Sequence, residues 1–236
     1  IQDSLVGSEM CIRDSICGGF TKEETESALI DLKFLGVDNI LALRGDPMKN
    51  ESTFVPTVGG NAYALDLIKQ INEMNNGQYL YEETKNSPSN FCIGTAGYPE
   101  KHFEAMNLST DMKHLKKKVD AGAEFIVTQL FYDNEKFFDF VKKCREIGIK
   151  VPIIPGIKPI TKLRHLSFIP KFFHVNFPES FSNELEKCKT DEEIKRVGIE
   201  WTTAQCKELV KADIPVIHFY TMGRGTAIKN IAKEIF

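Results

Sequence analysis

The sequence has no long hydrophobic run and no excess of basic charge. No apolar stretch approaches the roughly 18 residues that span a bilayer, and the first residues lack the basic flank, apolar core and cleavage site of a signal peptide. The formal net charge of −3 over 236 residues argues against a nucleic-acid-binding domain, which would carry a basic stripe. With 42% hydrophobic and 27% charged residues, the composition is typical of one globular cytoplasmic domain without membrane or nucleic-acid partners.

The sequence also lacks any metal-binding cysteine pattern. Its six cysteines are scattered, with no C-x-x-C pair and no nearby histidine cluster. This spacing disfavours a zinc site, and the missing secretory signal disfavours a disulfide framework. We expect no bound metal, and we expect the cysteines to pack as small hydrophobic side chains in a reducing compartment.

Short apolar segments alternate with amphipathic ones, which is the pattern of βαβ units around a parallel sheet. The expected strands are short and almost wholly apolar, as strands covered on both faces must be. They are Asn39–Leu43, Asn90–Ala96, Phe125–Gln129, Val151–Pro155 and Val216–Tyr220. These units fit either an open doubly wound sheet or part of a barrel. No G-x-G-x-x-G follows a strand and opens a helix, which favours an incomplete (β/α)8 TIM barrel with about its last five βα units.

Helix boundaries are marked by capping residues and glycines. Thr21 and Glu24 form a capping-box pattern that predicts a helix ending at Gly36. Further helices are expected to open at Ser109–Asp111, to follow Asp133 as far as Gly148, and to cover roughly Asp191–Lys211. The segments Asn76–Asn90 and Ser167–Lys189 are expected to be irregular.

Polar residues gather directly after the predicted strands, where parallel α/β folds place ligands and catalytic groups. The stretches are Arg44-Gly45-Asp46, Gly97 to His102, Gln129, Lys158, Thr221 and Arg224. Asp46 could equally belong to an ordinary strand-end turn with a surface ion pair. Gln129 could either hold the edge of a heterocycle such as a pterin or be a satisfied amide at a barrel mouth.

Two further patterns suit a flat, anionic ligand. Tyr98 and His102 offer an aromatic face and a hydrogen-bond donor after small residues, although a Gly-Pro turn with exposed polar groups is the alternative. On the following helix, Asp111, His114 and Lys118 fall near one another at helical spacing. A carboxylate can hold a ribose hydroxyl and an ammonium can hold a phosphate, whereas other lysines of this helix simply solvate its outer face.

Taken together, five stretches resemble the methylenetetrahydrofolate reductase family in order and spacing. They are LALRGDP, GYPEKH, KKKVDAGAEFIVTQLFYD, IIPGIKPI and HFYTMGR, and the resemblance runs from about Ile16 to the end. It implies an FAD-binding TIM-barrel catalytic domain over residues 16–236. NADH or NADPH would reduce the flavin, and 5,10-methylenetetrahydrofolate would then be reduced to 5-methyltetrahydrofolate for methionine supply. The resemblance also implies a homo-oligomer in the full-length enzyme.

The resemblance assigns roles to residues at matching positions. It implies catalytic roles for Asp46 and Gln129. The implied FAD contacts are Arg44, Gly45, Asp46, Tyr63, Ala64, Tyr98, His102, Asp111, His114, Lys117 and Lys118. The implied folate contacts are Asp46, Gln129, Arg224 and His165, the last standing where some relatives have a glutamine.

The first residues depart from the family. Residues 1–15, IQDSLVGSEMCIRDS, match nothing in it, and we expect them to be an artefactual lead-in. The resemblance implies three earlier βα units, the first bearing a glutamate that protonates folate N10. Without them a barrel cannot close, and loss of a general acid typically costs about 10²–10⁴-fold in rate. We therefore expect poor folding and impaired activity. The alternatives are a non-catalytic remnant that binds a flavin or a partner, and a TIM-barrel lyase using Lys158.

Overall fold

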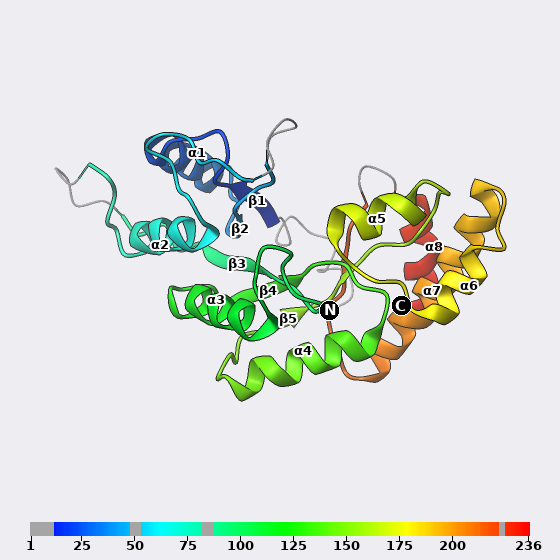
Figure 1. Ribbon diagram of the computed structural model, residues 1–236. Coiled ribbons are helices and arrows are strands. Elements are labelled where there is room, and N and C mark those ends of the chain that lie inside the picture. The colour runs from blue at the N-terminus through cyan, green and yellow to red at the C-terminus, as the bar shows by residue number, and fades with distance from the viewer. Residues whose placement is uncertain (1–11, 48–52, 82–86, 222–224) are drawn as a thin grey trace. The chain divides into compact units, whose positions relative to one another are not determined.

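A computed structural model describes residues 12–47, 53–81, 87–221 and 225–236, in which parallel strands alternate with helices (Figure 1). The strands are β1 Ile12–Ile16, β2 Asn39–Leu43, β3 Cys92–Gly97, β4 Phe125–Thr128, β5 Ile153–Ile154, β6 Gly156–Ile157 and β7 His218–Phe219. The helices are α1 Lys22–Phe34, α2 Ala64–Asn75, α3 Leu108–Asp120, α4 Asn134–Glu146, α5 His165–Phe173, α6 Glu179–Leu185, α7 Asp191–Lys211 and α8 Thr226–Ile235. The α/β class with parallel strands is therefore confirmed.

The strands pair in two groups, and the chain divides into two compact units. Hydrogen-bonded strands follow the order β1-β2-β3-β4-β5 in one sheet and β6-β7 in the other. Unit 1 contains residues 1–96 and 113–126, and unit 2 contains residues 97–112 and 127–236. Within the described ranges, none of the helices combines the length and the hydrophobicity that crossing a membrane requires.

Unit 1 is built on three parallel strands. Asn39 of β2 stands opposite Ile12 of β1 and Cys92 of β3 in the two registers. Its core includes Ile40 from β2, Ile93 from β3, and residues of α1 and α2, all fully buried or nearly so. The predicted capping box of α1 is confirmed, because the Thr21 amide donates to Glu24 Oε2 at 2.8 Å and the Glu24 amide donates to Thr21 Oγ1 at 3.2 Å.

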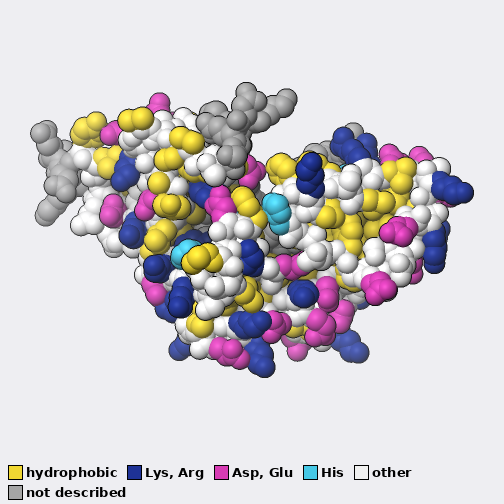
Figure 2. Space-filling view, in the orientation of Figure 1, with side chains coloured by type: hydrophobic (Ala, Val, Ile, Leu, Met, Phe, Trp, Pro, Cys, Tyr) yellow, Lys and Arg dark blue, Asp and Glu magenta, His cyan; other side chains and the backbone are white. Residues whose placement is uncertain are grey.

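Unit 2 packs its helices around an aromatic core. Phe181 of α6 stacks on Trp201 of α7 at 4.4 Å between ring centroids, and the Trp201 indole N–H donates to the Tyr132 carbonyl at 3.1 Å. The hydrogen bond satisfies the one polar group of the indole, so the ring can be buried without cost. Phe168 and Phe172 of α5 stack at 5.0 Å and are both exposed. Figure 2 shows hydrophobic side chains on the surface over this helix.

Two predictions about elements are wrong in unit 2. Ser167–Lys189 is not irregular, because α5 and α6 occupy much of it. Pro170 inside α5 disguises that helix in the sequence. The single strand expected over Val151–Pro155 is instead two short strands, β5 and β6, which belong to different sheets. Pro155 lies between them and has no N–H to continue a ladder.

Strand β1 lies largely within the segment predicted to be a lead-in. Its residues Ile12–Ile16 pair one for one with Asn39–Leu43 in parallel register. Backbone pairing uses groups that almost every residue carries, so it does not identify the origin of the segment. The boundary between a lead-in and the domain at residues 15 and 16 stays a prediction.

Candidate active site

Thr128, the last residue of β4, forms hydrogen bonds to residues at the ends of two other strands of unit 2, β6 and β7. The Gly156 amide donates to Thr128 Oγ1 at 2.9 Å, and the Tyr220 hydroxyl donates to the Thr128 carbonyl at 2.9 Å. The Tyr220 amide also donates to the Ile157 carbonyl at 2.9 Å. A Cβ added at Gly156 would lie 2.1 Å from the Thr128 carbonyl oxygen, so only glycine allows this approach. The residues that follow β4, β6 and β7 are thereby held near one another.

Gln129 follows Thr128 and presents its amide nitrogen. Its backbone N–H donates to the Gly97 carbonyl at 2.8 Å, which joins it to the loop after β3. Its side-chain oxygen accepts from the Leu130 amide at 3.0 Å. Among the described residues, the side-chain NH2 group has no hydrogen-bond acceptor. The half-buried carboxamide therefore has two donor hydrogens for a ligand.

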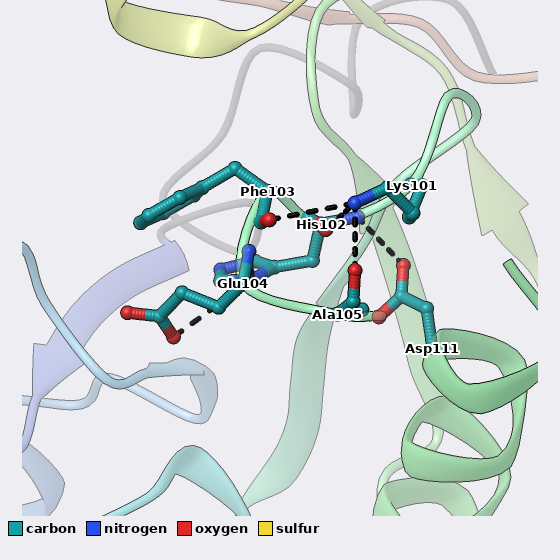
Figure 3. Close-up of polar contacts among 6 residues, drawn as sticks. All are labelled: Lys101, His102, Phe103, Glu104, Ala105 and Asp111. Carbon is teal, nitrogen blue, oxygen red and sulfur yellow. Dashed lines mark hydrogen bonds and ion pairs between the residues drawn. The ribbon is translucent and has the colours of Figure 1, made fainter. Parts of the chain in front are cut away.

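The loop after β3 is organised by Lys101 and Asp111 (Figure 3). The Lys101 ammonium donates to the carbonyls of His102, Phe103 and Ala105 at 3.1, 3.4 and 2.7 Å. The His102 amide donates to Asp111 Oδ2 at 2.8 Å. These bonds fix the backbone that carries the predicted ligand-binding side chains. Lys101 itself has a φ of +100°, which is unfavourable for a non-glycine residue, and these hydrogen bonds offset that cost.

The same loop carries a row of aromatic rings. Tyr98 meets His102 edge to face at 4.6 Å, His102 stacks on Phe103 at 4.8 Å, and Phe103 stacks on His174 at 4.8 Å. His102 Nδ1 accepts from the Glu104 amide at 3.2 Å, so this nitrogen carries no proton in that contact. Phe103 is 46% exposed, which gives the loop an aromatic surface open to solvent.

Asp111 has a different local role from the predicted one. Helix α3 begins at Leu108 rather than at Ser109–Asp111, and Asn107 Oδ1 accepts from the Thr110 amide at 2.9 Å in the manner of an N-cap. The Asp111 side chain is therefore not needed to open the helix and binds the His102 amide instead.

A buried lysine and a histidine follow β6. Lys158 is only 7% exposed, and burial lowers the pKa of its ammonium. The half-buried His165, the first residue of α5, accepts a hydrogen bond at Nδ1 from the Thr161 amide at 3.3 Å. Burial and then the nearby Lys158 charge are the largest causes that lower the pKa of His165 to about 4.

In unit 1, the predicted residues after β2 and at the start of α2 lie toward the surface. The Arg44 guanidinium lies 5.3 Å from the centre of the Phe54 ring, and Gly45 has a φ of +91° that suits glycine. Asp46 is exposed. Tyr63, which precedes α2, is 63% exposed, and its amide donates to Asp66 Oδ2 at 3.0 Å. Ala64, the first residue of α2, is half-buried.

The lysines of α3 differ in their surroundings, as predicted. Lys118 is half-buried, and its ammonium donates to the Ala96 carbonyl of β3 at 2.6 Å. Lys116 instead pairs with Asp120 on the solvated face. His114 and Lys117 are exposed on the unit 1 part of the helix.

The predicted site residues thus fall into both units. The described contacts bring together Tyr98, His102 and Asp111 in unit 2, with Gln129 joined through Gly97. Asp46 and Lys118 belong to unit 1, and their convergence with the unit 2 residues on one ligand stays a prediction. Arg224 lies outside the described residues.

The fold is an α/β domain whose parallel strands are followed by polar residues at their carboxyl ends. The family model described as "Methylenetetrahydrofolate reductase" matches residues 10–235. The chain is 39% identical to "Probable methylenetetrahydrofolate reductase (NADH)" of Oryza sativa subsp. japonica, over 93% of this chain and 36% of that protein. It is 40% identical to "Methylenetetrahydrofolate reductase (NADH) 1" of Arabidopsis thaliana, over 87% of this chain and 34% of that protein. The chain therefore belongs to the methylenetetrahydrofolate reductase family.

A bacterial relative extends the comparison. The "5,10-methylenetetrahydrofolate reductase" of Salmonella typhimurium strain LT2 is 32% identical over 89% of this chain and 64% of that protein. The chain thus spans little more than a third of the plant relatives' length and less than two thirds of this bacterial one. The predicted family is confirmed, and with it the TIM-barrel class, to which the alternation of parallel strands and helices conforms.

Proposed function

We propose that this domain reduces 5,10-methylenetetrahydrofolate to 5-methyltetrahydrofolate with NADH or NADPH as the reductant and FAD as the bound cofactor. The family match over residues 10–235 carries this proposal. Relatives named for NADH and for NADPH both occur, so the family supports either nicotinamide. The reaction consumes one NAD(P)H and one proton, and it converts the methylene bridge between N5 and N10 into a methyl group on N5.

The residue types present fit FAD, which combines a flat ring system, sugar hydroxyls and two phosphates. The aromatic pair of Tyr98 and His102 suits a ring, and the carboxylate of Asp111 can accept from a hydroxyl. Lys117 and Lys118 supply positive charge for the phosphates. The other proposed FAD contacts are Arg44, Gly45, Asp46, Tyr63, Ala64 and His114. When bound, FAD would supply the chemistry of hydride transfer between the nicotinamide and the folate.

The folate is proposed to be held by strand-end residues. The NH2 group of Gln129 can donate to the pterin ring, and the carboxylate of Asp46 can accept from the pterin amino group. Arg224 and His165 are proposed to meet the rest of the substrate. These groups would bind the pterin and the remainder of the substrate and so position it for reduction.

The test is a single turnover, because slow chemistry remains detectable in it. Protein loaded with FAD and held in excess is mixed anaerobically with NADH and methylenetetrahydrofolate, and 5-methyltetrahydrofolate is measured by mass spectrometry. Formation of the product only when NADH, protein and FAD are all present supports the proposal. Flavin binding without NADH oxidation would instead support a non-catalytic remnant. Covalent trapping of a carbonyl compound on Lys158 by borohydride would support the lyase.

For the whole protein we further propose a homo-oligomer that acts in the cytoplasm. The described cysteines are free thiols, and Cys17, Cys144 and Cys206 are buried, which confirms that these three pack as small core side chains. A reducing compartment preserves such thiols.

A further inference from the structure

Lys158 is a buried cation whose charge is not neutralised within the described protein. The residue is 7% exposed, yet no described residue gives its ammonium a hydrogen bond or a carboxylate partner. Buried lysines are ordinarily paired, since desolvation disfavours the charged form. Here burial lowers the pKa of Lys158, which means that the charged form is disfavoured. An anion bound next to the ammonium would stabilise the charged form.

His165 adds a second donor beside this charge. Its Nδ1 accepts from the Thr161 amide at 3.3 Å, so in the neutral ring the proton is on Nε2. Besides burial and Lys158, the charges of Arg164 and Lys162 lower the pKa of His165, and only Asp191 opposes them. The Asp191 carboxylate already accepts from the Leu163 amide at 2.8 Å. Among the described residues, the Nε2 hydrogen has no acceptor.

The backbone around Lys158 is held on two sides. The Tyr220 amide donates to the Ile157 carbonyl on one side, at 2.9 Å. On the other, helix α7 approaches so closely that a Cβ on Gly198 would lie 1.9 Å from the Ile160 carbonyl oxygen. The segment from Ile157 to Ile160 is therefore fixed, and with it the position of the Lys158 backbone.

We propose that Lys158, with the Nε2–H of His165 beside it, binds a carboxylate of the glutamate moiety of the folate substrate. This inference rests on the proposed function and assigns the lysine as a substrate-specificity residue. One ammonium and one neutral N–H match a single carboxylate better than a dianionic phosphate group. Lys158 directly follows β6 and Gln129 directly follows β4, and the contact between Gly156 and Thr128 joins these two strands, so the proposal has one folate meet both side chains.

The test compares two ligands that differ only in the glutamate. Binding of 5-methyltetrahydrofolate and of 5-methyltetrahydropteroate, which lacks the glutamate, is measured by calorimetry for the wild type, Lys158→Met and Lys171→Met. Lys171 is an exposed lysine of α5 and serves as the matched control. We expect Lys158→Met to weaken folate binding about 10- to 100-fold, as for the loss of a charged hydrogen bond. We expect pteroate binding to be unchanged in every variant.

Each other outcome contradicts a defined part of the account. Equal affinities of Lys158→Met and wild type for the folate would overturn the assignment of Lys158, as would an equal loss for both ligands. NADH binding is measured for the same three proteins, and a loss confined to NADH in Lys158→Met would overturn the assignment by giving the charge to a dinucleotide phosphate. Failure of the wild type to bind either folate compound would refute the proposed function itself. Because methionine removes a buried charge without leaving a large cavity, the variant is expected to fold, which circular dichroism checks.

Discussion

The backbone N–H of His102 donates a 2.8 Å hydrogen bond to Oδ2 of Asp111, nine residues later in the chain (Figure 3). This bond connects the loop after β3 to the first turn of α3. It is charge-assisted, and both residues are half-buried, so its loss is costly.

Two substitutions of Asp111 distinguish the contribution of its negative charge from that of its acceptor oxygen. Asp111→Ala should lower the free energy of unfolding by about 1–2 kcal/mol, because the His102 amide loses its partner. Asp111→Asn keeps an oxygen acceptor and should lose less than half of that amount. Urea unfolding of both variants measures the difference, and equal stabilities of the two would show that the bond does not hold the loop.

Lys101 combines an unfavourable backbone conformation with three carbonyl contacts. Its φ of +100° favours glycine, whereas its ammonium binds the carbonyls of His102, Phe103 and Ala105. Lys101→Ala loses the contacts and keeps the strain, and Lys101→Gly loses both. We expect the glycine variant to be about 1 kcal/mol more stable than the alanine variant. Thermal unfolding compares them directly, and a more stable alanine variant would argue against this backbone conformation.

Gly198 tests the contact that fixes the Lys158 segment. Alanine stabilises a helix by about 1 kcal/mol relative to glycine, but a Cβ here would lie 1.9 Å from the Ile160 carbonyl oxygen. Gly198→Ala should therefore destabilise unit 2, by at least about 2 kcal/mol. The control is Ala204→Gly, on the exposed face of the same helix, which should lose only about 1 kcal/mol. A stabilised Gly198→Ala variant would mean that α7 does not press on this segment.

The lowered pKa of His165 predicts that the free energy of unfolding decreases as the pH falls below 6.5. Burial, followed by the Lys158 charge, lowers the pKa of His165 from 6.5 to about 4, so the unfolded chain binds the proton more readily than the folded one. The corresponding stability is present above pH 6.5 and is lost as the pH falls from 6.5 through 4. At pH 5 the loss is about 1–2 kcal/mol for this half-buried ring.

His165→Gln removes that titration while keeping a polar side chain of similar length. Denaturant unfolding at pH 8 and pH 5 should show a smaller loss of stability in His165→Gln than in the wild type. The difference between the two losses should be about 1–2 kcal/mol. Identical losses would mean that His165 is protonated as easily in the folded protein as in the unfolded chain.

The elements that carried local signals were predictable from the sequence. Strand β2 and helix α7 have the predicted bounds, because apolar periodicity and capping residues define them without reference to the rest of the chain. Helix α5 was not predictable, because its internal Pro170 and dense aromatic residues contradict a helix locally, and only packing of residues such as Ile169 stabilises it.

For the candidate site, position was predictable and environment was not. Gln129, Tyr98 and His102 stand at strand ends that the alternating pattern identifies. The segment around Lys158 meets distant parts of unit 2, because Gly156 lies against the Thr128 carbonyl and Gly198 of α7 lies against the Ile160 carbonyl. No property of the local sequence around Lys158 reports those contacts.

The most direct test of the central claim separates the two halves of the reaction at Gln129. FAD-loaded wild type and Gln129→Leu are first reduced anaerobically with NADH, and methylenetetrahydrofolate is then added while flavin absorbance is followed. The account predicts similar rates of reduction by NADH but reoxidation by the folate that is about 10- to 100-fold slower in Gln129→Leu, because the pterin loses its amide partner. Reoxidation of both proteins at the same rate would contradict a folate site at this strand end.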